Sequence, residues 1–240
     1  MNTQFNFLSQ IEHRPWKMPA KPWQYYQEWN DVLFLHFEVN YNELKELVPP
    51  DLPLDSFEGR YYVSVVAFKM EHIRPAYLPS ISFISDFYEI NVRTYVKKNE
   101  KSGVYFINIE AAKKLAALVA KTLSGLPYEE SDIIRNKKAY TNHNILKKFN
   151  LDAVFEVKDQ INKKTKLGIW LTERYCLFLK KNNAIRIFEI HHKEWEIFNV
   201  NILNLEINYR FKALTIDNYK MVLCHYSPGV QVVSWNYNII

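Results

Sequence analysis

The chain has 240 residues, and its hydrophobic fraction of 48% and charged fraction of 24% are ordinary for a globular protein of one large or two small domains. Its formal net charge of +5 is carried by scattered lysine pairs, which excludes the clustered basic patch with interleaved aromatic residues that nucleic-acid binding needs. No apolar run approaches the ~20 residues of a membrane span, and the opening residues lack the apolar segment of a secretion signal, so we expect neither a membrane nor a nucleic-acid partner.

The N-terminal half of the chain begins with an aromatic-rich, irregular stretch and continues with strands. Bulky aromatic residues are rare in disordered tails, so we predict that residues 1–30 form an ordered arm packed on the core. Leucines at helical spacing predict a short helix over 40–47 that ends before Pro49. Period-2 alternation and β-branched residues predict strands over 31–39, 61–70, 87–98 and 104–109.

The C-terminal half contains the best helical pattern, over residues 111–123, and a further series of strands. An apolar stripe along 111–123 ends at Ser124 and Gly125, and helical spacing returns over 167–175. The strands follow one another mostly by hairpins, and no linker or repeat divides the chain. We therefore predict one α+β domain over residues 1–240, a mostly antiparallel β-barrel with a few peripheral helices. The additional strands are expected over 152–157, 176–179, 184–190, 194–205, 206–214, 220–226 and 230–235.

Residues 88–96 are the most informative segment, because the two faces of this predicted strand differ in chemistry. One face is apolar and β-branched, whereas the other carries Glu89, Asn91 and Arg93 between Phe87 and Tyr95. A solvated face is the plain alternative, but this mixture favours the inner wall of a polar pocket with aromatic ends.

Inward-pointing charges on this strand would need partners from elsewhere in the fold. Glu89 and Arg93 lie roughly 13 Å apart along a strand, which is too far for direct pairing. An unpaired buried charge is costly, so each would need another partner. The candidates are Glu173, Arg174, Glu38 and His36.

Six segments, in order and over nearly the whole chain, carry a family resemblance. They are Phe34–Val39, Glu89–Val96, Leu126–Tyr128, Thr172–Cys176, Glu189–His192 and His225–Val230. Together they resemble the YqjF-like family of uncharacterised bacterial proteins (domain of unknown function 2071). That family is grouped with the acetoacetate decarboxylase-like fold, so the resemblance implies an antiparallel barrel with an internal cavity.

The acetoacetate decarboxylase-like fold also implies two candidate catalytic residues. Acetoacetate decarboxylases carry a glutamate on a strand similar to 88–96, which Glu89 matches. Their Schiff-base lysine lies in a Pro-Lys-Lys-Leu segment, and Lys113 begins a similar Lys-Lys-Leu run here, with Ala112 in place of the proline. On the predicted helix, however, Lys113 falls at the edge of the apolar stripe, where its ammonium reaches water.

Two other polar residues are candidate ligand contacts, each with a structural alternative. His36 lies on an otherwise apolar strand face, where histidine is more often a hydrogen-bonded core residue. Arg174, beside Trp170, is either half of an ion pair or an anion-binding side chain. His191 and its neighbour point to opposite faces of a strand without a third ligand, so we expect no metal. The five glycines form no phosphate-binding loop or dinucleotide fingerprint, so we expect no cofactor.

These observations predict a barrel protein that binds a small anionic or carbonyl-bearing organic molecule. The first alternative is a decarboxylase- or aldolase-like lyase that works through a Lys113 imine with Glu89 as acid and base. A structural or protein-interaction role is the second alternative, and a homo-oligomer stays open. Cys176 and Cys224 lie in apolar contexts typical of buried thiols, which indicates the reducing cytoplasm. The predicted ligand-binding residues are Glu89, Asn91, Arg93, Tyr95, His36 and Arg174.

Overall fold

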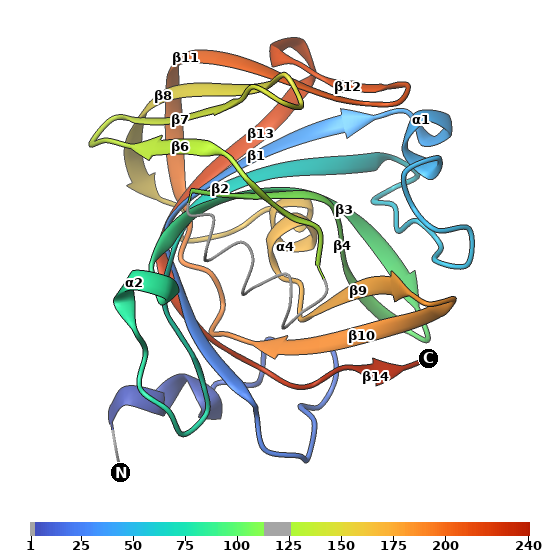
Figure 1. The fold of residues 1–240 in the computed structure, drawn as a ribbon, viewed down its shortest axis with the longest axis vertical. Coiled ribbons are helices and arrows are strands. Elements are labelled where there is room, and N and C mark those ends of the chain that lie inside the picture. Colours follow the sequence, from blue (N-terminus) through green and yellow to red (C-terminus); the bar gives the residue numbers. More distant parts are fainter. Residues whose placement is uncertain (1–2, 113–125) are drawn as a thin grey trace.

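A computed structural model describes residues 3–112 and 126–240. The central feature of the fold is a barrel (Figure 1), which seven strands form. The strand order is β10-β9-β4-β3-β2-β1-β13, and a short pairing between β13 and β10 closes the ring. Every barrel pair is antiparallel except β4 with β9. The barrel strands are β1 (Tyr25–Val39), β2 (Tyr61–Pro75), β3 (Phe87–Lys98), β4 (Lys101–Ala111), β9 (Cys176–Lys181), β10 (Ala184–His191) and β13 (Met221–Ser234).

A second layer of strands extends the sheet beyond β13 and folds over one side of the barrel, at the top of Figure 1. Its inner residues pack against the outward faces of β1, β2 and β3 in one large hydrophobic cluster that includes Leu35, Val65, Val92 and Phe155. The strands β1–β3 are therefore buried on both faces, one toward this layer and one toward the barrel interior. The remaining strands are β5 (Tyr128–Glu130), β6 (Asp132–Arg135), β7 (Ala139–Asn144), β8 (Phe149–Gln160), β11 (Phe198–Phe211), β12 (Leu214–Ile216) and β14 (Asn238–Ile239).

The helices are short and sit at the ends of strands. In α4 the hydroxyl of Thr165 caps the helix by accepting a hydrogen bond from the Gly168 amide at 3.0 Å. The buried Leu171 then packs this helix against Tyr62 and Tyr95 at one end of the barrel. In the described residues, no helix is both long and apolar enough to cross a bilayer. Within residues 3–112 and 126–240 the helices are α1 (Tyr41–Lys45), α2 (Ser82–Ser85) and α4 (Lys166–Thr172), with 3-10 turns η1 (Thr3–Ser9) and η2 (Asn218–Lys220).

The predicted fold class, a mostly antiparallel barrel with few helices, is confirmed, but several boundaries were wrong. The arm is shorter than predicted, because residues 25–30 already belong to β1 and a left-handed Asp31 interrupts the alternation. The segments 220–226 and 230–235 form the single strand β13, which continues through the left-handed Gly229. Ala111 ends β4 and does not begin a helix, and the rest of the predicted helix from residue 113 lies outside the described residues.

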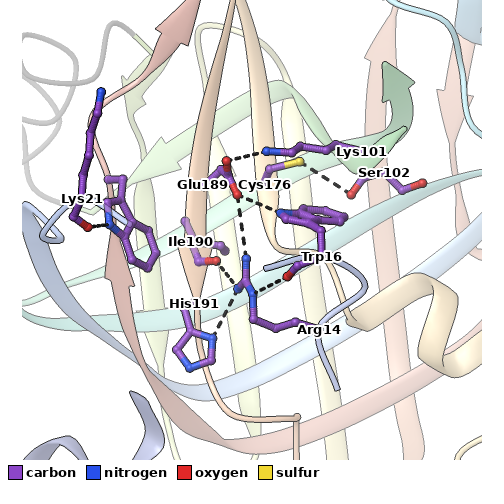
Figure 2. Close-up of polar contacts among 10 residues, drawn as sticks. Arg14, Trp16, Lys21, Lys101, Ser102, Cys176, Glu189, Ile190 and His191 are labelled. Carbon is purple, nitrogen blue, oxygen red and sulfur yellow. Dashed lines mark hydrogen bonds and ion pairs between the residues drawn. The ribbon is translucent and has the colours of Figure 1, made fainter. Parts of the chain in front are cut away.

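Buried polar contacts fasten the N-terminal arm to the barrel (Figure 2). The guanidinium of Arg14 donates to the carbonyl of Ile190 at 2.7 Å and lies 3.9 Å from the Glu189 carboxylate. The same carboxylate accepts from the indole of Trp16 at 2.8 Å and from the ammonium of Lys101 at 2.6 Å. The Arg14 side chain is only 1% exposed, and burial lowers its pKa while Glu189 partly offsets that effect. Glu189 is thus the anion around which the arm is fixed.

Removal of the Glu189 carboxylate is expected to destabilise the protein strongly, because Arg14 and Lys101 would lose their buried counter-charge. For Glu189→Ala we expect a loss of about 3–5 kcal/mol in the free energy of unfolding, measured by urea denaturation. The matched control is Glu38→Ala, which breaks a half-exposed pair with Arg60 and should cost about 1 kcal/mol or less. Equal effects of the two substitutions would contradict the role given to Glu189.

Candidate functional site

The inward face of the sheet carries a cavity of about 220 Å³ in the barrel interior. Glu89, Asn91 and Arg93 share one face of β3 because they alternate along the strand. On the neighbouring strand β2 they lie opposite Phe68, Val66 and Ser64. All three polar side chains of β3 line the cavity and are at most 8% exposed. The polar face recognised in the sequence is therefore an interior wall and not a solvated surface.

Glu89 is held in this wall by two hydrogen bonds. Its carboxylate accepts from the phenol of Tyr128 at 2.9 Å and from the amide of Asn91 at 3.1 Å. Burial raises the pKa of Glu89 to about 7, although the two hydrogen bonds act in the opposite direction. The carboxyl group can thus give or take a proton near neutral pH. Its partners are these two residues and not the candidates Arg174 or His36.

Arg93 is the least compensated charge in the wall. It forms no ion pair with any carboxylate in residues 3–112 or 126–240, and its Nε and Nη2 atoms are buried without a hydrogen-bond partner there. Burial lowers the pKa of the guanidinium, and the nearby phenol of Tyr95 offsets part of this effect. Nε and Nη2 form the side edge of the guanidinium. This edge can bind a carboxylate by donating two parallel hydrogen bonds.

Arg174 brings a second guanidinium to the cavity from the segment after α4. It donates to Asp55 Oδ2 at 2.8 Å and to the carbonyl of Trp170 at 2.7 Å, and its plane lies over the rings of Trp170 and Tyr95. Its remaining Nη2 atom is buried without a partner among the described residues. Arg174 therefore forms the ion pair foreseen for it, and the alternative role in anion binding stays a prediction.

Aromatic side chains form most of the remaining wall. The guanidinium carbon of Arg93 lies 5.7 Å from the centre of the Phe34 ring. Phe34 meets Trp195 edge to face at 5.1 Å, and Trp195 stacks on Trp29 at 6.2 Å, which in turn contacts Phe68 at 6.0 Å. This aromatic ladder of Phe34, Trp195, Trp29 and Phe68 leads away from Arg93 along the cavity.

The aromatic residues of the ladder were not predicted from the sequence. The predicted walls were Phe87 and Tyr95, neither of which is among the lining residues. Trp29 was assigned to the arm, and Trp195 comes from a segment with no chemical pattern of its own. Phe34 and Tyr128 alone carried a signal, through their places in the Phe34–Val39 and Leu126–Tyr128 motifs.

His36 and Tyr95 are buried beside the cavity but do not line it, so we do not retain them as ligand contacts. Tyr95 donates to the carbonyl of Leu171 at 3.0 Å, which leaves the phenol oxygen to accept from Ser64. Ser64 in turn accepts from Nδ1 of His36 at 2.6 Å. Burial holds the pKa of His36 well below its usual value, so the ring is neutral. This hydrogen-bond chain joins β1, β2 and β3 to α4 beneath Arg93.

The two remaining site predictions concern the lysine and metal chemistry. Lys113 lies outside the described residues, and no lysine occurs among the described residues of the cavity lining. Across residues 3–112 and 126–240, no cluster of three potential metal ligands is found. Burial lowers the pKa of His192 to about 3, so this lining histidine is a neutral ring against Trp195.

The arm fixed by Glu189 borders the same cavity. Ile190 and Cys176 line it, as does Trp235, whose indole donates to the carbonyl of Lys21 in the arm at 2.6 Å. Burial raises the pKa of Cys176 to about 12, which leaves it an unreactive thiol. The arm thus supports the wall from outside and adds no reactive group.

Comparisons with known proteins agree with this architecture. The profile of the DUF2071 family, described as an uncharacterized conserved protein, matches residues 26–231. The chain is 33% identical over 227 residues to the uncharacterized protein YqjF of Bacillus subtilis (strain 168), covering 91% of this chain and 93% of that protein.

Solved structures show the same fold at low sequence identity. An acetoacetate decarboxylase superimposes with a TM-score of 0.62 at 14% identity, covering 98% of this chain and 96% of that one. An acetoacetate decarboxylase-like enzyme from Sphingomonas wittichii RW1 gives 0.60 at 12% identity, with 94% and 97% covered. The enduracididine biosynthesis enzyme MppR gives 0.60 at 8% identity, with 91% and 90% covered.

The raised pKa of Glu89 predicts a specific pH dependence of stability. The folded state binds a proton at this site up to about pH 7, whereas the unfolded chain releases it near the ordinary value of 4.5. Stability from this group is therefore complete below pH 4.5 and is lost as pH rises toward 7, by about 3 kcal/mol. Glu89→Gln should gain on the wild type by that amount between pH 4.5 and about 7.5, measured by urea unfolding.

The control for this measurement is Glu206→Gln, at an exposed carboxylate on β11. Its difference from the wild type should stay within about 0.5 kcal/mol over the same pH range. A Glu89→Gln curve parallel to that of the wild type would show that Glu89 titrates normally.

Proposed function

The chain belongs to the DUF2071 family of uncharacterized conserved proteins, and we propose that it binds a small organic carboxylate in the barrel cavity. The observation that carries this proposal is that Nε and Nη2 of Arg93 are buried without a hydrogen-bond partner among the described residues. A buried guanidinium without a protein carboxylate is costly, and an anionic ligand would supply the missing counter-charge. Arg174 Nη2 would add a further donor to the same anion.

The side chains of the remaining wall limit the polarity of the ligand beyond its carboxylate. Apart from Glu89, Asn91 and the two arginines, the wall is mainly aromatic and aliphatic. A ligand with one charged end and an apolar or carbonyl-bearing remainder satisfies both parts of the lining. MppR, which shares the fold, is known in a complex with pyruvate, which is a small carboxylate.

The proposal is tested by calorimetric titration with propionate and with its neutral analogue propionamide. We expect propionate to bind and propionamide not to bind, because only the carboxylate pairs with Arg93. Arg93→Met should weaken propionate binding about tenfold or more, since a charge-assisted hydrogen bond contributes about 1.5–3 kcal/mol. Arg210→Met, at an exposed arginine on β11, is the matched control and should bind as the wild type does. Equal binding of acid and amide would refute the proposal.

One observation favours a second candidate function, a decarboxylase- or aldolase-like lyase. Glu89 has a pKa near 7 inside the cavity, which suits a group that transfers protons to a bound carbonyl compound. The lysine of such a reaction would be Lys113, outside the described residues. Binding without turnover stays our first choice, because the described lining contains no lysine.

Borohydride reduction in the presence of pyruvate separates the two candidates. An imine would be reduced to a stable secondary amine, visible in the intact mass and assignable by peptide mapping. We expect no added mass at Lys113, because the sequence places its ammonium toward water. A trapped adduct at this residue, absent from Lys113→Arg, would make the lyase the first choice.

Location and assembly follow as parts of the same proposal. Two free thiols, Cys176 and Cys224, suit a reducing compartment, and we place the protein in the cytoplasm. A purely structural role is disfavoured, because free donors on Arg93 and Arg174 beside a cavity serve no packing purpose. All the residues to which this proposal gives a role come from one chain.

A further inference from the structure

The aromatic ladder lines the cavity with rings that the binding of a carboxylate alone does not need. Phe34, Trp195, Trp29 and Phe68 come from β1, β2 and the segment before β11, so three separate parts of the chain supply rings to one wall. Phe34, Phe68 and Trp195 are at most 4% exposed. An aliphatic acid of two or three carbons would fill only part of the cavity of about 220 Å³ that these rings line.

The ladder begins at the charged end of the cavity. Arg93 lies over the ring of Phe34, and the contacts from Phe34 to Trp195 and on to Trp29 lead away from the guanidinium. A carboxylate on the free edge of Arg93 therefore places the next atoms of its ligand beside aromatic rings. Rings prefer offset stacked or edge-to-face neighbours about 4.5–7 Å apart, which is the spacing already present between the wall residues.

Trp195 is held in place by groups that have no part in the carboxylate site. Its backbone amide donates to Glu173 Oε1 at 3.2 Å, and that carboxylate also pairs with Lys164 at 2.7 Å. Its ring rests on the neutral His192 at 5.3 Å. The wall is thus preorganised, which lowers the entropy lost when a rigid ligand binds.

The volume of the cavity limits the ligand to a single ring. An apolar cavity of about 150 Å³ accommodates benzene. The cavity here measures about 220 Å³, which leaves room for one six-membered ring with a short carboxylate side chain. Two fused rings with the same side chain would exceed this space without movement of the wall.

We infer that the ligand is an aryl carboxylate, a single aromatic ring joined to a carboxylate by a short linker, with the acid on Arg93 and the ring on the aromatic ladder. This inference rests on the proposed function, because it assumes that the cavity takes a carboxylate. It adds that the part of the ligand beyond the carboxylate is an aromatic ring. It also assigns Trp195 and Trp29 as the residues that select this ring.

The test is calorimetric titration of the full chain with acetate, cyclohexylacetate and phenylacetate, three acids that differ only in the group attached. We expect phenylacetate to bind at least tenfold more tightly than acetate, because the ring leaves water. We expect it to bind about 2- to 10-fold more tightly than cyclohexylacetate, which has a similar size but lacks an aromatic face. Trp195→Leu should reduce the phenylacetate-to-cyclohexylacetate ratio toward one.

Trp23→Leu is the matched control, since this tryptophan lies in the arm and is not among the lining residues. It should preserve the wild-type ratio. If Trp195→Leu does not fold, Trp29→Leu takes its place and should lower the ratio in the same way.

The outcomes separate this inference from the proposed function. If acetate binds in an Arg93-dependent way but phenylacetate binds no better, the inference is overturned and the carboxylate site stands. Equal affinity for the phenyl and cyclohexyl acids, or an unchanged ratio in both tryptophan variants, also overturns it. If none of the three acids binds, the proposed function itself fails.

Discussion

Burial of charge on the inner face of β3 is the constraint on which the rest of this site depends. The barrel closes through β10 and β13, so water does not freely solvate Glu89, Arg93 and Arg174. The free-energy cost of burial is offset in a different way for each of these three charges. Glu89 has a raised pKa and two hydrogen-bond donors, and Arg174 has Asp55. Arg93 has no carboxylate within the described chain, so it is the position where a ligand has most to contribute.

The surrounding fold stabilises the sheet that carries these buried charges. Because β1, β2 and β3 also pack against β6–β8 and β11 on their outer faces, the sheet beneath the cavity is supported from both sides. The chain from His36 through Ser64 and Tyr95 to α4 ties the strands together directly below Arg93. These contacts resist collapse of the cavity, which a wall covered on one face only would undergo more readily.

Shared fold and shared chemistry are separate matters here. The acetoacetate decarboxylase-like structures superimpose over nearly the whole chain, yet identities of 8–14% transfer only the architecture. What the residues of this chain provide independently is an interior cavity with an aromatic wall and an arginine edge that lacks a partner among the described residues.

The sequence by itself determined the strand-rich fold and the polar inner face of β3, because both depend on a period of two that any half-buried strand displays. It also singled out Arg174, whose neighbours Trp170 and Leu171 marked a buried context. Only the tertiary structure decided which residues meet those side chains. Tyr128 reaches Glu89 from a segment 39 residues away in the sequence, and Phe34 on β1 meets both Arg93 on β3 and Trp195. Such contacts leave no local periodicity, so tertiary packing alone placed an aromatic wall beside an arginine that has no carboxylate partner among the described residues.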